Sequence, residues 1–357
     1  MSSRAAILPF PGDPFLLNYW LSFFDNVWGS EVDKLYIYLN SPIEPAVVDY
    51  IRALCLQNPK INLQYNNTQT DHGPAIDRTL DIVTEELVML VEDDGFIFKP
   101  GMVDSCFKQL ENGDYDIVGS KRSSCAMEIL SAAQVKWGLD YEGEGDQGPN
   151  FWPCFFFSSK ALLLGTDRNF SAKGWSRGEV VAGLEHTIVG DIANGDTFVN
   201  TSLQLRGKVP IGRIFCVPQY HGHPDDLQHA QQSKYLFNGL APWTHVGSLS
   251  SGVGGILQDD KGRSLARRLI DPAKQSTKLP TQWCQTDMEK KEFERRVQWW
   301  LTFWEYSKDI KNSPASPEIK EFHRLYGQAI YQIIEQYGLS IGEIHKRQKV
   351  YKGVLGI

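Results

Sequence analysis

The segment LVMLVEDDGFIFKPG, residues 87–101, is the part of the chain that decides the fold. Five apolar residues run directly into three carboxylates, Glu92, Asp93 and Asp94, and a glycine and a second apolar run follow. An uninterrupted apolar run of this length is typical of a strand that is buried on both faces of a sheet. Because adjacent carboxylates repel one another, three of them after a buried strand predict a positively charged ligand.

The sequence around this segment alternates apolar runs with amphipathic segments from residue 5 to about residue 120. Strand patterns occupy residues 5–10, 35–40, 61–66 and 87–91, and helical patterns occupy residues 15–28, 45–57 and 73–85. This order predicts an α/β fold with a mostly parallel sheet and helices on both faces. In such sheets, ligands bind at the carboxyl ends of the strands, where Asn40 and the acid cluster lie.

Composition excludes several classes of protein. The chain has 357 residues, of which 42% are hydrophobic and 22% charged, so we expect an ordered globular fold. A net charge of −7 gives no general attraction for nucleic acid or anionic membranes. We find no signal peptide and no run of about 20 apolar residues, so we expect a cytoplasmic protein. The six scattered cysteines predict reduced structural thiols.

The acid cluster resembles the DxD motif of GT-A-fold glycosyltransferases, and the chain is most similar to the broad family 2 type over residues 5–230. The resemblance implies a Rossmann-like GT-A fold and a nucleoside-diphosphate sugar, UDP-sugar favoured, as donor. It also implies that Asp94 binds Mn²⁺ or Mg²⁺, because hard divalent cations prefer carboxylate oxygens and share them with phosphates. Glu92 then lies nearer the ribose or sugar and is a second metal ligand, and Asp93 joins the donor site.

Other segments follow the order of the family. The resemblance implies that Pro11, Asp13 and Asn40 hold the nucleoside. It assigns the HGPAIDR stretch to a Gly-x-x-x-x-Arg pattern that contributes to the donor site through Gly73, Asp77 and Arg78. It further implies a metal-binding histidine after the last core strand, for which the sequence offers His221 and His223. Since alternate residues of an extended segment face opposite ways, we expect only one of the two to bind metal.

The resemblance also implies a mechanism. A carboxylate deprotonates an acceptor hydroxyl, which attacks the anomeric carbon while the metal stabilises the departing nucleoside diphosphate. Glu185 is the first choice for this base and Asp191 the second, which makes the enzyme inverting. The retaining course stays open, as do the donor sugar and the acceptor, which is a glycan, a lipid-linked sugar, a protein or a hydroxymethylated DNA base.

We divide the chain into three parts. Residues 1–235 form the predicted catalytic domain, with a nucleotide-sugar half to about residue 120 and an acceptor half beyond it. Residues 236–284 are rich in Gly, Ser and Pro and are predicted to form a loop or lid. Residues 285–357 carry two apolar helical faces and predict a helical hairpin that packs on the core or on a second subunit.

Two alternatives remain open from the sequence. Residues 223–226, His-Pro-Asp-Asp, resemble the signature of zinc-dependent sugar N-deacetylases, although in that class the motif follows the first strand. A non-catalytic protein that binds sugar nucleotides is the other alternative. A nucleic-acid acceptor requires a basic groove, for which KRSS at 121–124, KGRSLARR at 261–268 and the HKRQK segment near the C-terminus are the candidates.

Overall fold

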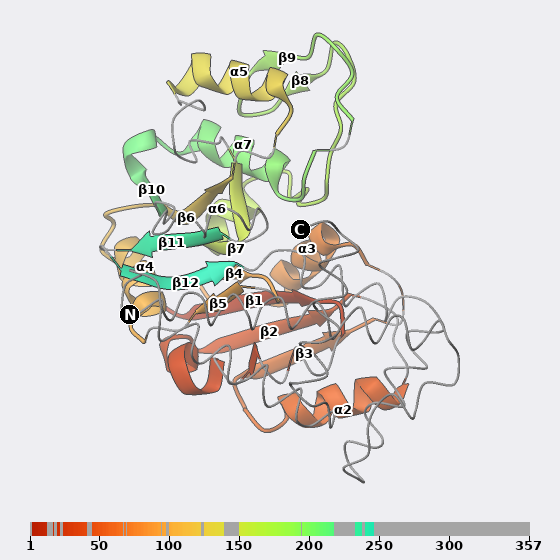
Figure 1. Ribbon diagram of the computed structural model, residues 1–357, viewed down its shortest axis with the longest axis vertical. Helices are drawn as coiled ribbons and strands as arrows, with labels where there is room; N and C mark the ends of the chain where they lie inside the picture. The colour runs from red at the N-terminus through yellow and green to blue at the C-terminus, as the bar shows by residue number, and fades with distance from the viewer. Residues whose placement is uncertain are drawn as a thin grey trace, which may run out of the picture.

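The structure is a computed structural model, in which we describe residues 2–12, 17, 20–21, 24–40, 45–66, 68, 70–93, 95–97, 100–122, 125–138, 150–193, 195–217, 233–237 and 240–245. A seven-stranded sheet forms its centre (Figure 1). In spatial order its strands are β10 (Ile214–Val217), β6 (Ile117–Arg122), β7 (Asn150–Ser159), β4 (Leu87–Val91), β1 (Arg4–Phe10), β2 (Lys34–Leu39) and β3 (Ile61–Tyr65). All neighbouring pairs are parallel except those that involve β7, so the predicted mostly parallel sheet is confirmed.

Helices cover both faces of this sheet, as the sequence predicts. Successive residues of a strand point to opposite faces. Phe156 of β7 contacts Phe198, at the start of α7 (Val199–Lys208), with ring centroids 4.9 Å apart. The next residue, Phe157, contacts Phe107 of α4 (Met102–Glu111) at 5.1 Å. The helix α3 (His72–Ile82) shares the α7 face, because its apolar residues join the core cluster that contains Phe156 and Phe198.

Smaller elements complete the described chain. They are α2 (Pro45–Cys55), α5 (Met127–Trp137), α6 (Lys160–Leu164), the π-helical turn η1 (Phe24–Trp28), the 3-10 turns η2 (Gly29–Glu31) and η3 (Ile211–Arg213), and the short strands β5 (Gly95–Ile97), β8 (Val180–Val181), β9 (His186–Thr187), β11 (Ser233–Phe237) and β12 (Leu240–His245). The helix α5 and the β8–β9 hairpin lie together at the top of Figure 1. They share a second apolar core with α7, which includes Ile129, Trp175 and Leu203.

The register brings several strand ends to one edge. Phe10 of β1 pairs with Leu39 of β2, and Ile7 pairs with Leu90 of β4, so the three parallel strands end close together. The antiparallel strand β7 begins at this edge, because Phe155 pairs with the last residue of β4 and the chain from residue 150 lies beyond it. We call this the carboxyl edge of the sheet.

A three-stranded sheet differs from what we expected of residues 236–284. Strand β5 follows the acid cluster and pairs with β12, which pairs with β11, and both pairs are antiparallel. Residues 240–245, predicted as part of a loop or lid, therefore form a strand, and the boundary predicted at residue 235 falls within β11. These residues form a strand because their backbone pairs with β5, which is far away in the sequence. Local composition does not reveal such a pairing. Residues 246–357, with the predicted helical hairpin, lie outside the described residues.

Two further expectations concern the whole chain. Among the described helices, we find none with the length and apolar character needed to cross a bilayer. None of the five described cysteines forms a disulfide, and Cys55, Cys106 and Cys154 are buried. Burial raises the pKa of Cys55 and of Cys125 to about 12, which keeps both thiols protonated and unreactive near neutral pH.

Candidate active site

The acid cluster forms a turn at the carboxyl edge of the sheet, directly after β4. The amide of Gly95 donates a hydrogen bond to the carbonyl of Glu92 at 3.0 Å and closes this turn. The Gly95 carbonyl accepts a hydrogen bond from the indole nitrogen of Trp20, also at 3.0 Å. Asp93 is buried and Glu92 half-buried, while Asp94 lies outside the described residues. We call residues 92–95 the acid turn.

His72, the first residue of α3, lies beside the acid turn. Its Nε2 atom is 3.7 Å from Oε1 of Glu92. We did not single out His72 from the sequence, although it begins the HGPAIDR stretch that we assigned to the donor site. The imidazole of His72 supplies a polar group next to the acid turn.

The ends of β1 and β2 build the predicted nucleoside site. The amide of Asn40 donates to the carbonyl of Phe10 at 3.0 Å, and the amide of Thr70 donates to the carbonyl of Asn40 at 2.8 Å. Pro11 follows β1 at the same edge, whereas Asp13 lies outside the described residues. The side-chain oxygen Oδ1 of Asn40 is buried and has no hydrogen-bond partner among the described residues. A buried amide oxygen of this kind indicates a missing donor, such as a group of a bound ligand.

Arg78 is held near this nucleoside site. Its Nη1 atom donates to the hydroxyl of Tyr38 at 2.9 Å and to Oγ1 of Thr70 at 3.1 Å. Burial acts to raise the pKa of Tyr38, but the hydrogen bonds with Arg78 and Thr70 outweigh it and lower that pKa from its usual value. Within the described residues we find no carboxylate paired with Arg78. Its charge is therefore suited to an anionic ligand.

Gly73 and Asp77, which we assigned to the donor site, face residues 168–171, which follow α6. A Cβ atom at Gly73 would lie 2.3 Å from the backbone nitrogen of Ser171. Asp77 lies against Phe170 and Arg168, and its Oδ1 atom is buried and has no hydrogen-bond partner among the described residues. Burial raises the pKa of Asp77 to about 6, although the amide of Phe170 and the charge of Arg168 oppose the rise. Both residues thus fix where α3 sits.

Glu185 and Asp191 lie in the β8–β9 hairpin region and are exposed. Glu185 occupies the turn between the two strands with φ of 58°. The Oδ1 atom of Asp191 accepts a hydrogen bond from the amide of Arg177 at 2.7 Å. The hairpin is tied to α5 by Glu128, which contacts His186 Nε2 at 2.9 Å and accepts a hydrogen bond from the amide of Val189 at 2.6 Å.

The predicted histidine ligands, His221 and His223, lie outside the described residues. Strand β12 pairs with the strand that follows the acid turn, with His245 opposite Gly95 of β5. The sequence offers no signal for this pairing. Among the described residues, no three His, Cys, Asp or Glu side chains gather as a metal site. The carboxylates of Glu92 and Asp93 are nevertheless the donor type that Mn²⁺ and Mg²⁺ prefer.

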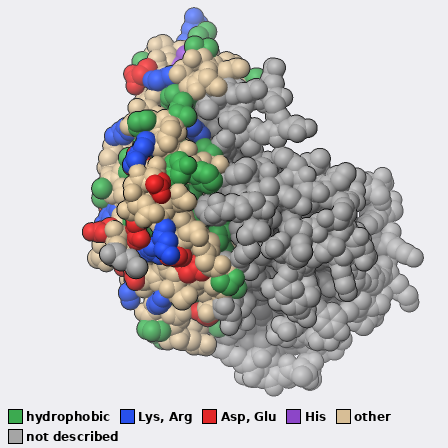
Figure 2. Space-filling model, turned by 90° about the vertical axis from the view of Figure 1, so that its left-hand side faces the viewer, with side chains coloured by type: hydrophobic (Ala, Val, Ile, Leu, Met, Phe, Trp, Pro, Cys, Tyr) green, Lys and Arg blue, Asp and Glu red, His purple; other side chains and the backbone are tan. Residues whose placement is uncertain are grey.

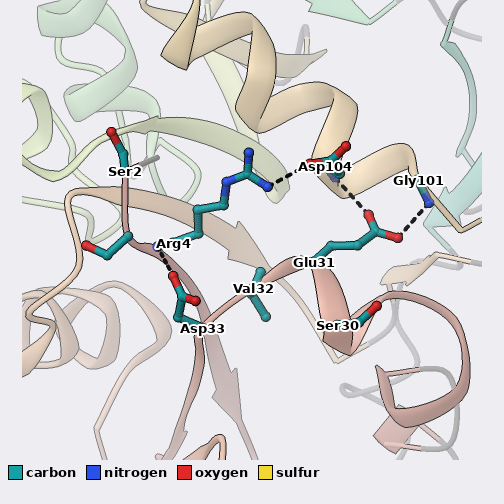
Figure 3. A pocket seen from close by; sticks show the side chains of 9 residues that line it. Ser2, Arg4, Ser30, Glu31, Val32, Asp33, Gly101 and Asp104 are labelled. Atoms are coloured by element: carbon teal, nitrogen blue, oxygen red, sulfur yellow. Dashed lines mark hydrogen bonds and ion pairs between the residues drawn. The ribbon is translucent and has the colours of Figure 1, made fainter.

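A hollow of about 650 Å³ opens at the opposite edge of the sheet (Figure 3). Its charged groups already have partners. Arg4 binds Asp104 at 2.8 Å and Glu111 at 2.9 Å, and both carboxylate oxygens of Glu31 accept hydrogen bonds from the first turn of α4. These contacts hold α4 against β1 and β2. The charged groups of this hollow therefore have structural roles, and the predicted site residues Asn40, Arg78 and Glu92 do not line it.

The surface gives no support for a nucleic-acid groove on the face seen in Figure 2. Basic and acidic side chains are interleaved on the described part of that face, and no broad basic area forms there. Residues 121–122, which we singled out as a basic candidate, end strand β6 at the carboxyl edge, opposite residues 150–151 of β7. The other two basic segments lie outside the described residues.

No protein-family model and no curated protein sequence matches the chain. Solved structures of glucosyl-3-phosphoglycerate synthase from Mycobacterium tuberculosis are similar to it. One of them, a complex with Mn²⁺, UDP and glucosyl-3-phosphoglycerate, is 13% identical with a TM-score of 0.39, and the alignment covers 64% of this chain and 75% of that one. A second, with Mn²⁺, UDP-glucose and glycerol 3-phosphate, is 14% identical with a TM-score of 0.37, and covers 64% and 76%.

Proposed function

We propose that this chain is a GT-A-fold glycosyltransferase that moves a sugar from a nucleoside-diphosphate sugar to an acceptor hydroxyl. The observation that carries the proposal is the acid turn, in which carboxylates follow the central buried strand at the edge where α/β sheets bind ligands. At the same edge, and counting the described residues alone, the side-chain oxygen of Asn40 is buried without a hydrogen-bond partner and Arg78 has no carboxylate partner. An anionic nucleotide with a divalent ion fits these groups.

Different residues are proposed to bind different parts of the donor. Asn40 and Pro11 lie where the nucleoside is expected, and Arg78 lies beside them with its charge available for the diphosphate. Asp94 and Glu92 would hold Mn²⁺ or Mg²⁺ together with one histidine, and Asp93 would join the donor site. The candidates for that histidine are His221 and His223. When bound, the ion neutralises charge on the leaving nucleoside diphosphate.

Glu185 remains the proposed base, with Asp191 as the alternative. Glu185 is one of three described non-glycine residues with positive φ. Such backbone strain persists where the surrounding structure enforces it and is concentrated at functional sites. Comparing donor turnover in Glu185→Gln and Asp191→Asn decides between the two. Loss of a general base lowers turnover by about 10²–10⁴-fold while leaving nucleotide binding intact.

Nucleotide-dependent stabilisation tests the proposal before the acceptor is identified. We expect one nucleoside diphosphate, UDP first, to raise the free energy of unfolding in the presence of Mn²⁺, by about 2.7 kcal/mol at 100 times its Kd. Asp94→Ala should abolish this stabilisation. Asp114→Ala, which removes an exposed acid after α4, should keep it. Stabilisation by Zn²⁺ alone that depends on His223, with no response to any nucleotide, would instead favour the deacetylase.

A further inference from the structure

Trp20 makes a buried hydrogen bond to the acid turn. Its indole nitrogen lies 3.0 Å from the carbonyl oxygen of Gly95, and only 2% of the residue is exposed. The indole has a single donor and no acceptor, so this contact accounts for its full hydrogen-bonding capacity. Trp20 comes from the segment after β1, 75 residues before Gly95. The bond therefore joins the two segments that build the proposed donor site.

This bond holds Gly95, the last residue of the acid turn, from outside the turn. The amide of Gly95 is bound to Glu92 within the turn, and the carbonyl of Gly95 is bound to Trp20 outside it. Repulsion among the neighbouring carboxylates favours opening of the turn when no cation is present. A buried carbonyl that lost its donor would also be left unsatisfied. The Trp20 bond opposes both changes.

Trp20 is itself held rigidly. Its ring stacks on Phe24 at 6.1 Å and meets Trp28 edge-on at 5.5 Å, and Phe24 meets Trp28 at 4.9 Å. All three side chains are at least 98% buried. Since a close-packed aromatic cluster leaves its members little freedom, the donor nitrogen is fixed before any ligand arrives.

We propose that Trp20 is a positioning residue, which keeps the acid turn in the shape that binds a divalent cation. The inference rests on the proposed function, because it assigns the cation to this turn. It goes beyond that function in giving a role to a residue with no chemistry of its own and no contact with the ion. It also predicts that the segment after β1 and the cation site respond to one another.

Two matched substitutions test this role. Trp20→Phe removes the donor and keeps an aromatic ring in the cluster. Trp28→Phe makes the same change of size in the same cluster but leaves the bond to Gly95 in place. We expect Trp20→Phe to raise the Kd for Mn²⁺, measured by titration calorimetry without nucleotide, by about tenfold, a value usual for loss of a group that orients metal ligands. Trp28→Phe should leave this Kd unchanged.

A second measurement does not require metal binding. Hydrogen exchange of the Gly95 amide reports directly on the turn, and we expect it to accelerate by about tenfold in Trp20→Phe and not in Trp28→Phe. Equal effects of the two substitutions would show that packing alone matters and would overturn the proposal. Absence of Mn²⁺ binding in the wild type would contradict the proposed function, and unchanged Gly95 exchange in Trp20→Phe would overturn the role of Trp20.

Discussion

Gly73 shows how a single hydrogen atom in place of a side chain permits a close contact between two segments. The backbone of Ser171 passes so near that a Cβ atom would lie 2.3 Å from its nitrogen and 2.5 Å from its Cα atom. Neither backbone atom can rotate away as a flexible side chain would. The position of α3, and of His72 beside the acid turn, therefore depends on this glycine.

We predict that Gly73→Ala lowers the free energy of unfolding by about 1–3 kcal/mol, the usual cost of overpacking a filled site. Urea denaturation measures this loss. Gly212→Ala is the matched control, because nothing lies within 4 Å of a Cβ atom there, and it should change stability by less than about 0.5 kcal/mol. Similar losses in both variants would contradict the contact with Ser171.

Asp77 makes the free energy of unfolding depend on pH. Burial raises its pKa in the folded chain to about 6, from an ordinary value of 3.8. The folded state thus keeps this proton to higher pH than the unfolded state, so stability falls as pH rises from about 4 to 6. We predict that Asp77→Asn removes this fall and is more stable than the wild type at pH 7 by about 1–3 kcal/mol.

Denaturation of both proteins at pH 4 and pH 7 measures this effect. Asp81→Asn is the control, because Asp81 binds Arg168 at 2.7 Å but its side chain is 62% exposed. The stability of this variant should decrease between pH 4 and pH 7 as that of the wild type does. If the stability of Asp77→Asn falls between pH 4 and pH 7 as much as that of the wild type, the pKa of Asp77 is not raised on folding.

At the scale of elements, α4 is capped by a residue far away in the sequence. Its own N-terminus supplies no side-chain hydrogen bond, and Gly101 before it is left-handed with φ of 84°. Glu31 of η2 fills this role, because it accepts hydrogen bonds from the amides of Gly101 at 2.6 Å and Asp104 at 2.8 Å (Figure 3). A carboxylate at this end also interacts favourably with the helix dipole.

We predict that Glu31→Ala destabilises the protein by about 1–2 kcal/mol, the usual cost of losing a helix cap. Thermal unfolding and circular dichroism measure the effect, and Glu31→Gln should lose less because one side-chain oxygen still accepts a hydrogen bond. The control is Glu86→Ala, whose carboxylate is exposed. If Glu31→Ala is as stable as this control, the contacts to α4 contribute nothing.

Elements with regular periodicity could be predicted from the sequence, and elements that depend on distant partners could not. Apolar runs identified strands β1, β2 and β4, since a strand buried on both faces excludes polar residues along most of its length. Strand β3, at the edge of the sheet, instead alternates apolar and polar residues. The helix expected over residues 15–28 instead ends in a π-helical turn at residues 24–28, where the aromatic cluster packs. The pairing of β12 with β5 depends on backbone groups, which all residues share, so composition did not reveal it.

For the whole molecule, the alternation of strands and helices predicted the α/β class and the edge at which polar residues meet. The structure brings Asn40, Arg78 and the acid turn to that edge, as the sequence led us to expect. Gly73 and Asp77 have a packing role that the sequence did not indicate, because a glycine or an acid in a helical segment looks the same whether it faces a ligand or another loop. His72, Trp20 and His245 emerged only from the three-dimensional arrangement.

The pairing of β5 with β12 also sets an order of events during synthesis. The ribosome releases β12 roughly 140 residues after β5, which at the usual 5–20 residues per second is a delay of about 7–28 s. The segment that carries Trp20 is synthesised before the acid turn. The strand that pairs with β5 carries His245 and follows only after the central sheet has been synthesised.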